Sequence, residues 1–142
     1  MRALILLAIL LSGCASMPPD KQAVYAAHGA DIASTAVGLA AGAAEANPLG
    51  VLLIPVKVIL TENCDRQPEP ARTGCLHAVE AVAWSATANN IAWLVNPVVA
   101  PFVGLIAGIS KWQQGAPMRD FMAACAVHRE LTKNPHLKCE HA

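Results

Sequence analysis

Four cysteines in the body of the chain have the most reactive side chains in the sequence: Cys64, Cys75, Cys125 and Cys139. An even set of this kind in an exported protein predicts two disulfides, because the compartments outside the cytosol are oxidising. Three pairings are possible. We favour the pairing of neighbours, Cys64 with Cys75 and Cys125 with Cys139, because each pair would close a short loop.

A metal site is the alternative use of these cysteines. The spacings Cys125-x-x-His128 and His136-x-x-Cys139-x-His141 bring soft ligands together near the C-terminus. They lack the paired Cys-x-x-Cys of zinc knuckles, and exported thiols tend to oxidise. The disulfide interpretation therefore comes first, and no metal or other cofactor is expected.

No group of residues has the pattern of a catalytic site. His77 and Glu80 have a helical i, i+3 spacing that metal-carboxylate sites use, but the pair stands alone. No serine follows the glycine pattern of a nucleophile elbow, and no phosphate-binding loop is present. The net charge is zero and there is no basic patch, which argues against nucleic acid as a partner. The sequence predicts a protein that is not an enzyme.

Five polar residues stand out in the apolar first half of the chain: Asp31, Thr35, Glu45, Asn47 and Lys57. Lys57 lies within a run of valine, leucine and isoleucine, so its charge needs a partner. Asp31 or Glu45 could supply it, since ionisable groups inside membrane helices are usually paired. The alternative is that Lys57 buries only its stem and reaches an interface with its head. We expect a polar seam at these residues.

The N-terminal residues follow the order of segments that is typical of a secretory signal peptide. Arg2 is followed by an apolar run over residues 3–11 that is too short to span a bilayer, and the run ends in Leu11-Ser12-Gly13-Cys14. This ending resembles the lipobox of bacterial lipoprotein precursors. The resemblance implies that residues 1–13 are a signal peptide and that Cys14 takes the lipid. Residues 14–19 would then be the anchor and a spacer, and membrane lipid the first partner.

The same features predict a location in the cell envelope, with the lipid on the periplasmic side. Ala15 and Ser16 follow Cys14 without the aspartate that retains lipoproteins in the inner membrane, which favours the outer membrane. Spanning helices would favour the inner membrane instead, and the sequence leans toward that choice. The sequence is 55% hydrophobic and only 14% charged, whereas soluble domains average about 25% charged residues. This composition suits close contact with lipid.

The chain from 20 to 142 reads as a single all-α domain. Breaks at Asn47-Pro48 and Asn96-Pro97 divide it into a first hairpin (20–63), a loop (64–75) and a second hairpin (76–114), before a C-terminal helix and tail (115–142). Asp20 is expected to cap the first helix, which should run to residue 46. The two breaks lie 49 residues apart, which raises the possibility of an internal duplication. The segment from 117 to 133 has an amphipathic pattern.

The hairpins could cross a bilayer or form a lipid-tethered bundle. A crossing needs about 20 helical residues, and the helices ending near residues 46 and 95 reach that length while their partners fall short. Gly38 and Gly42 have the small-xxx-small spacing of close helix packing. Trp84, Trp93 and Trp112 suit either the ends of a span or a packed core.

The order Asp31-x-x-Ser34-Thr35, then Glu45-x-Asn47-Pro48, then Lys57 resembles a family of small uncharacterised integral membrane proteins. The resemblance implies helices that meet at the Asn-Pro break, and it implies no reaction. We therefore expect a non-enzymatic envelope protein that contacts a membrane or periplasmic protein. The alternative is a small transporter or channel component in which Asp31, Glu45, Asn89 and Asn90 line a path through the membrane.

Overall fold

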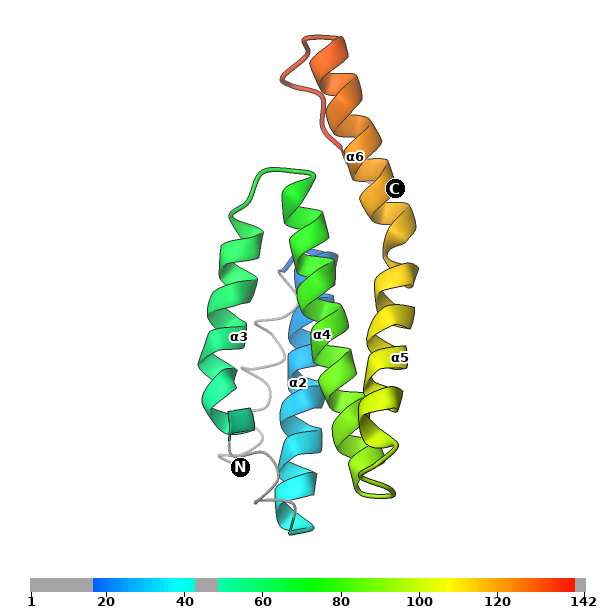
Figure 1. Cartoon of the computed structure of the whole chain (residues 1–142). Helices are drawn as coiled ribbons and strands as arrows, with labels where there is room; N and C mark the ends of the chain where they lie inside the picture. Colours follow the sequence, from blue (N-terminus) through cyan, green and yellow to red (C-terminus); the bar gives the residue numbers. More distant parts are fainter. Residues whose placement is uncertain (1–16, 43–48, 140–142) are drawn as a thin grey trace.

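The computed structural model describes residues 17–42 and 49–139, and every regular element in these residues is an α-helix (Figure 1). In chain order the helices are α2 (Pro19–Ala40), α3 (Leu49–Asp65), α4 (Ala71–Trp93), α5 (Ala100–Gln114) and α6 (Ala116–Leu131). This confirms the expected all-α class. The order expected from the sequence, two antiparallel pairs followed by a C-terminal helix, is also confirmed.

Helix α4 lies at the centre of the bundle. It packs most extensively against α5 and α2 and less against α3. The direct contact between α2 and α3 is smaller than any of these three contacts. Figure 1 shows the connection between α3 and α4 at one end, here called the upper end, and the turn between α4 and α5 at the lower end. A small apolar core of Val24, Leu76 and Cys64 joins α2, α3 and α4.

Helix α2 differs from its expected form at both ends. It begins at Pro19, a residue type that suits the first turn because its missing N–H needs no partner there, so Asp20 is not the cap. It ends at Ala40, and Gly42 follows with a φ of 87°, a backbone conformation that glycine adopts without a steric penalty. Gly42 therefore does not share a helix face with Gly38, and the expected glycine packing surface on this helix is wrong.

Helix α3 is longer than expected and passes through Pro55. It continues to Asp65, and α4 begins at Ala71, so the connection covers only 66–70 and not the whole of 64–75. Both ends of the expected loop are helical because the side chains there make contacts with neighbouring helices. Cys64 and Cys75 form a disulfide, and Asp65 binds Lys21 and Arg72.

The turn between α4 and α5 satisfies its own backbone N–H groups. From residue 94 to residue 100 each N–H donates to an oxygen within the same segment or the last turn of α4, and Pro97 has none to donate. The donors are Leu94, Val95, Asn96, Val98, Val99 and Ala100. Asn96 makes this possible, because its side-chain oxygen accepts from Val98 at 2.9 Å and its carbonyl accepts from Val99 and Ala100.

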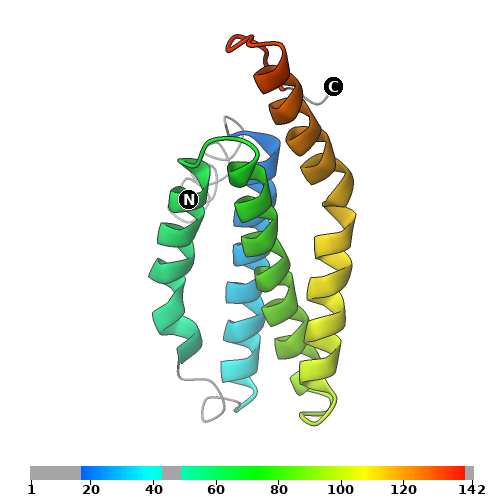
Figure 2. The ribbon, with the colours of Figure 1, turned by 45° about the horizontal axis from the view of Figure 1, so that its top comes forward.

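Helix α6 extends beyond the upper end of the bundle, roughly in line with α5 (Figures 1 and 2). Its contacts with α4 and α5 are few, and Met122 is its one buried residue. The chain then folds back, and the Cys125–Cys139 disulfide ties the tail to the helix. The expected amphipathic helix is thus present, one residue earlier at its start, as a projecting arm.

Within the described residues, no helix combines the length and the hydropathy that a bilayer crossing requires. Helices α2 and α4 have 22 and 23 residues, so they are long enough but not apolar enough. The expectation of spanning helices finds no support here.

Candidate functional site

A buried ion pair joins the first two helices of the bundle. Lys57 on α3 reaches Asp31 on α2 and binds its Oδ2 atom, and the Asp31 side chain is only 3% exposed. A carboxylate removed from water to this extent needs compensating donors. Lys57 provides the charge that Asp31 requires, which is the pairing expected from its apolar surroundings.

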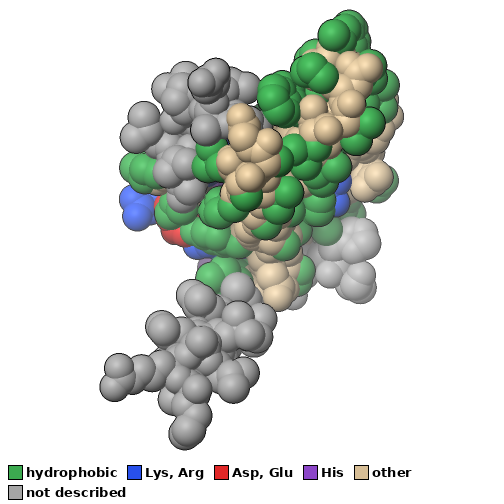
Figure 3. All heavy atoms as spheres, turned by 90° about the horizontal axis from the view of Figure 1, so that it is seen from below, with side chains coloured by type: hydrophobic (Ala, Val, Ile, Leu, Met, Phe, Trp, Pro, Cys, Tyr) green, Lys and Arg blue, Asp and Glu red, His purple; other side chains and the backbone are tan. Residues whose placement is uncertain are grey.

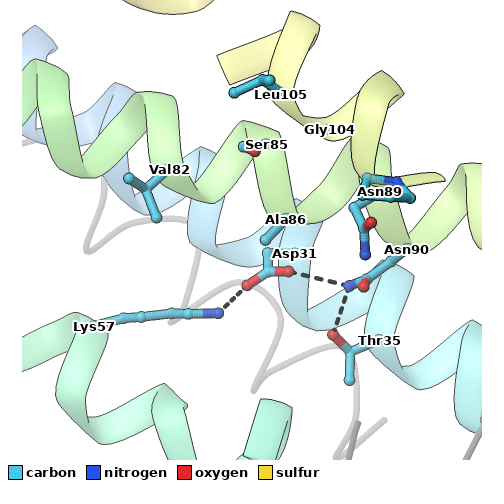
Figure 4. Close-up of a pocket in the computed structure, with 11 residues that line it drawn as sticks. Asp31, Thr35, Lys57, Val82, Ser85, Ala86, Asn89, Asn90, Gly104 and Leu105 are labelled. Carbon is cyan, nitrogen blue, oxygen red and sulfur yellow. Dashed lines mark hydrogen bonds and ion pairs between the residues drawn. The ribbon is translucent and has the colours of Figure 1, made fainter. Parts of the chain in front are cut away.

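A second donor to Asp31 comes from α4. The Asn90 side-chain N–H group lies 3.2 Å from Asp31 Oδ1, 3.2 Å from Ser34 Oγ and 3.0 Å from Thr35 Oγ1 (Figure 4). Ser34 in turn donates to the Asp31 carbonyl at 3.0 Å. These residues, Asp31, Ser34, Thr35, Lys57 and Asn90, form what we call the seam cluster, and it ties α2, α3 and α4 together at one level.

Four members of the seam cluster line an open cavity of about 490 Å³: Asp31, Thr35, Lys57 and Asn90. Figure 4 shows α3 and α5 on either side of α4, with Lys57 reaching in from α3 and Leu105 facing in from α5. The walls also include Val82, Ser85 and Asn89 of α4. The cavity therefore combines one compensated charge pair with largely apolar walls.

The polar contacts between α2 and α3 continue toward the upper end. His28 Nε2 lies 3.0 Å from Thr61 Oγ1, and that hydroxyl donates to the Lys57 carbonyl at 2.9 Å. Because the single hydroxyl proton is used in this way, His28 Nε2 must carry the proton it donates to Thr61. His28 Nδ1 is then a buried acceptor, and it has no hydrogen-bond partner among the described residues.

A separate network of charges closes the upper end. Lys21 on α2 binds Glu62 at 3.0 Å and Asp65 at 2.8 Å on α3, and Tyr25 donates to Glu62 at 2.7 Å. Arg72 at the start of α4 pairs with Asp65 at 2.8 Å and also with Asp20 and Glu69. We call this set the upper network: Asp20, Lys21, Tyr25, Glu62, Asp65, Glu69 and Arg72.

The upper network shifts the titration of its members in consistent directions. Hydrogen bonds from Tyr25 and then Lys21 lower the pKa of Glu62, and the hydrogen bond from Lys21 lowers the pKa of Asp65. The hydrogen bond to Asp65, followed by that to Glu62, raises the pKa of Lys21. Burial opposes the charge of Arg72, but its hydrogen bonds to Asp20 and Asp65 outweigh this and raise its pKa. Lys21, Glu62, Asp65 and Arg72 are thus held in their charged forms around neutral pH.

The second hairpin has its own acid–base pair and a close backbone approach. Glu80 on α4 lies 3.0 Å from Lys111 on α5. Glu80 follows Asp31 by 49 residues, the same offset as between the two Asn-Pro breaks, and it likewise bridges the two helices of its hairpin. A methyl group at Gly104 would lie 2.8 Å from the Ser85 carbonyl oxygen, and one at Gly108 would lie 3.0 Å from Ser85 Cβ. The small-xxx-small packing expected at Gly38 and Gly42 is found here, four residues apart on α5.

Both expected disulfides are present. Cys64 and Cys75 have Cα atoms 5.3 Å apart, and Cys125 and Cys139 have Cα atoms 5.9 Å apart, which are ordinary separations for bridged cysteines. Among the described residues, no group of three or more His, Cys, Asp or Glu side chains could hold a metal ion. His77 does not join Glu80 in a shared site, because it lies against Gly115 while Glu80 faces Lys111.

The structure brings together three of the five residues of the expected polar seam: Asp31, Thr35 and Lys57. Glu45 and Asn47 lie outside the described residues, as does Cys14. Sequence analysis grouped Asn90 with a transport path and did not connect it to Asp31. The sequence pattern included Ser34 but did not place it in the seam, and it did not indicate the contact between His28 and Thr61. A signal was available for Asn90, because an amide in the charge-free run from 81 to 110 requires a polar partner when it is buried.

The chemistry of the seam cluster is that of a structural contact. A nucleophile needs a base within hydrogen-bond reach, and the base needs an orienting third group. Ser34 instead donates to a backbone carbonyl, and the Asp31 carboxylate is occupied by Lys57 and Asn90. The cluster holds three helices in register, and it leaves no group activated for attack on a substrate.

Comparison with known proteins finds no relative: no family model, no curated protein and no solved structure matches this chain. The resemblance to small integral membrane proteins therefore rests on the residues of the seam pattern alone, and the function has to be argued from the structure of this chain.

Proposed function

We propose that this chain is a lipid-anchored protein of the cell envelope that works without catalysis, by contacting another membrane or periplasmic component. The observation that carries the proposal is the position of its two disulfides. Cys64–Cys75 closes the upper end of the bundle, and Cys125–Cys139 staples the arm that projects from that end (Figures 1 and 2). Both suit a chain that folds outside the cytosol.

The position of α2 supports an anchor near the same end. The start of α2, drawn in blue, lies toward the upper end in Figure 1, and Cys14 precedes Pro19 by only five residues. An acylated Cys14 would hold the upper end close to the membrane surface. The charged upper network and α6 would then face the periplasm, where their charges remain in water.

Helix α6 is the part best suited to meet a protein partner. It makes few contacts with the rest of the bundle, and Val127 and Leu131 are exposed on it. The disulfide to Cys139 holds the helix and the tail together as one rigid unit without help from a core. A preorganised arm of this kind loses little conformational entropy on binding.

The anchor is tested by labelling cells that express the native chain or the Cys14→Ala variant with radioactive palmitate. We expect label on the native chain alone, together with loss of residues 1–13 in the mature protein by mass spectrometry. An unlabelled native chain that retains its N-terminus would refute the anchor.

The contact role is tested by site-specific photocrosslinking in cells. A photoreactive amino acid in place of Val127 on α6 should yield a discrete higher-mass protein adduct. The matched control is the same amino acid in place of Val95, which is also exposed but lies in the α4–α5 turn at the other end. A protein adduct from position 95 and none from position 127 would contradict the proposed role of the arm.

A further inference from the structure

The exposed apolar side chains of the bundle gather on its lower part. All four bundle helices contribute: Val37 on α2, Ile59 on α3, Val82 on α4 and Ile106 on α5 are all exposed, and Val95 at the turn is 88% exposed. In the view from below, hydrophobic side chains are spread over the described surface among uncharged atoms, and charged side chains show only at its margins (Figure 3). We call this surface the apolar belt.

Charge is nearly absent from the same part of the molecule. The described residues 32–42 and 81–110 contain no Asp, Glu, Lys or Arg. Below the upper network, Asp31 and Lys57 bind each other across α2 and α3, and Glu80 and Lys111 bind each other where the belt begins. Among the described residues, charged side chains therefore occur in this part of the molecule only as compensated pairs, which is the arrangement found inside hydrocarbon.

Exposed apolar side chains lie on all four bundle helices, which bears on what covers them. A protein partner would cover one face and leave the opposite helices exposed to water, whereas lipid contacts all sides equally. Soluble monomers rarely expose apolar patches beyond a few hundred Å². The backbone of the α4–α5 turn agrees with a lipid environment, because its N–H groups from 94 to 100 are all donated internally and need no water.

A boundary feature marks the upper edge of the belt. Trp112 lies near the end of α5, and the Arg119 guanidinium of α6 sits 3.5 Å from the centre of its ring. Tryptophan and arginine together are typical of the level where hydrocarbon meets headgroups. Trp112 lies one residue beyond Lys111, so the aromatic ring, the charges and the start of the belt share one level.

From these observations we infer that the apolar belt is immersed in membrane lipid, with the upper network, Trp112 and α6 at or above the headgroups. From Ala81 to Val95 the helical rise gives a depth of about 21 Å, against roughly 30 Å for the hydrocarbon core. The bundle dips into the bilayer as a body. The immersion deepens the proposed function, and it needs no acyl chain on Cys14.

Flotation with liposomes tests the immersion separately from the anchor. The full chain carrying Cys14→Ala is mixed with liposomes of phosphatidylethanolamine and phosphatidylglycerol and centrifuged through a density gradient. It should float with the lipid. Adding Ile106→Asp, which places a charge at a position 64% exposed in the belt, should reduce flotation at least about tenfold. Adding Leu131→Asp at the exposed end of α6 should leave flotation unchanged.

Two results would overturn the immersion. One is a Cys14→Ala chain that stays in the aqueous fractions, alone or as an oligomer, because protein contacts would then cover the belt. The other is an Ile106→Asp variant that floats as well as its parent. Circular dichroism and intact disulfides confirm that each variant is folded. A negative palmitate label would refute the anchor and leave the flotation result standing, so the two claims fail separately.

Quenching by brominated lipids gives a second reading of the same depth. Trp93 is the last residue of α4, and Trp112 lies at the upper edge of the belt. In variants that keep one of these tryptophans, bromines deep in the acyl chains should quench Trp93 more than Trp112, and bromines near the headgroups should do the reverse. Equal quenching of both by either lipid would contradict the inferred orientation.

Discussion

In the hairpin of α4 and α5 the two backbones nearly touch, whereas α2 and α3 are connected mainly through long polar side chains. Gly104 and Gly108 bring α5 onto Ser85 of α4. Between α2 and α3, by contrast, Lys57 spans the space to Asp31, and a cavity of about 180 Å³ lies beside them, lined by His28, Lys57 and Val82.

The difference shows that one sequence pattern can be stabilised in two physical ways. Both halves read as helix, Asn-Pro, helix. In the second half, small residues supply the close van der Waals contact that holds helices together where the hydrophobic effect is weak. In the first half, hydrogen bonds and ion pairs take over that role, and α4 completes them through Asn90. The first half should therefore respond to charge removal and the second to added volume.

The largest effect is expected from Lys57→Met. Among the described residues, the change leaves the buried Asp31 carboxylate with Asn90 as its only side-chain donor, which should lower the free energy of unfolding by about 3 kcal/mol. Lys57→Arg keeps the charge and should cost clearly less. Urea unfolding followed by circular dichroism measures both. Equal losses for the two variants would mean that the charge pair does not hold α3 in place.

Gly104→Ala should have the next largest effect, about 2 kcal/mol, because the added methyl group meets the Ser85 backbone and α5 has to move. The matched control is Gly29→Ala in α2, where nothing lies within 4 Å of the added group. That control should stabilise the protein by about 0.5 to 1 kcal/mol, since alanine is the better helix former. If both variants were stabilised, the close approach of α4 and α5 would be wrong.

Asn90→Ala tests the link between the two halves. It removes the donor that Asp31, Ser34 and Thr35 share, and the loss of a buried amide of this kind costs on the order of 1 to 2 kcal/mol. Combined with Lys57→Met, the effects should not add, because both changes act on the same carboxylate. A double-mutant cycle that shows strict additivity would separate Asn90 from the ion pair.

The smallest effect is expected at the exposed end of the first hairpin. Lys21→Met should cost less than about 1 kcal/mol, because water and salt screen the upper network. One molar salt should reduce that cost further, since the screening length falls to about 3 Å, and should leave the cost of Lys57→Met nearly unchanged. A cost for Lys21→Met that does not change with salt would argue against this screening.

The upper network also predicts a dependence on pH. Glu62 and Asp65 have lowered pKa values in the folded protein. Their contribution to the stability of the folded state is therefore present above the ordinary carboxyl pKa of about 4 and is lost as the pH falls through the lowered values. Lys21 has a raised pKa, and its contribution is lost as the pH rises above about 10.5. Lys21→Met should flatten the stability profile at both limits.

Much of the architecture could be predicted from local patterns. Apolar periodicity and the Asn-Pro breaks predicted the helices, and the short separations between cysteines favoured the pairing that the structure has. Helix ends were less predictable, because tertiary contacts decide them. The binding of Asp65 to Lys21 and Arg72 extends α3 past residue 62, and the Cys64–Cys75 bridge keeps the start of α4 helical.

By itself, the sequence determined that the chain is all helical, that Lys57 needs an acidic partner and that four cysteines form two bridges. Each of these follows from local residue chemistry. Only the tertiary structure decided that Asn90 completes the Asp31 site, that Gly104 and Gly108 form the close contact, and that all four bundle helices carry exposed apolar side chains. These three features depend on which faces the helices turn toward each other. That choice involves residues far apart in the sequence, so local patterns do not determine it.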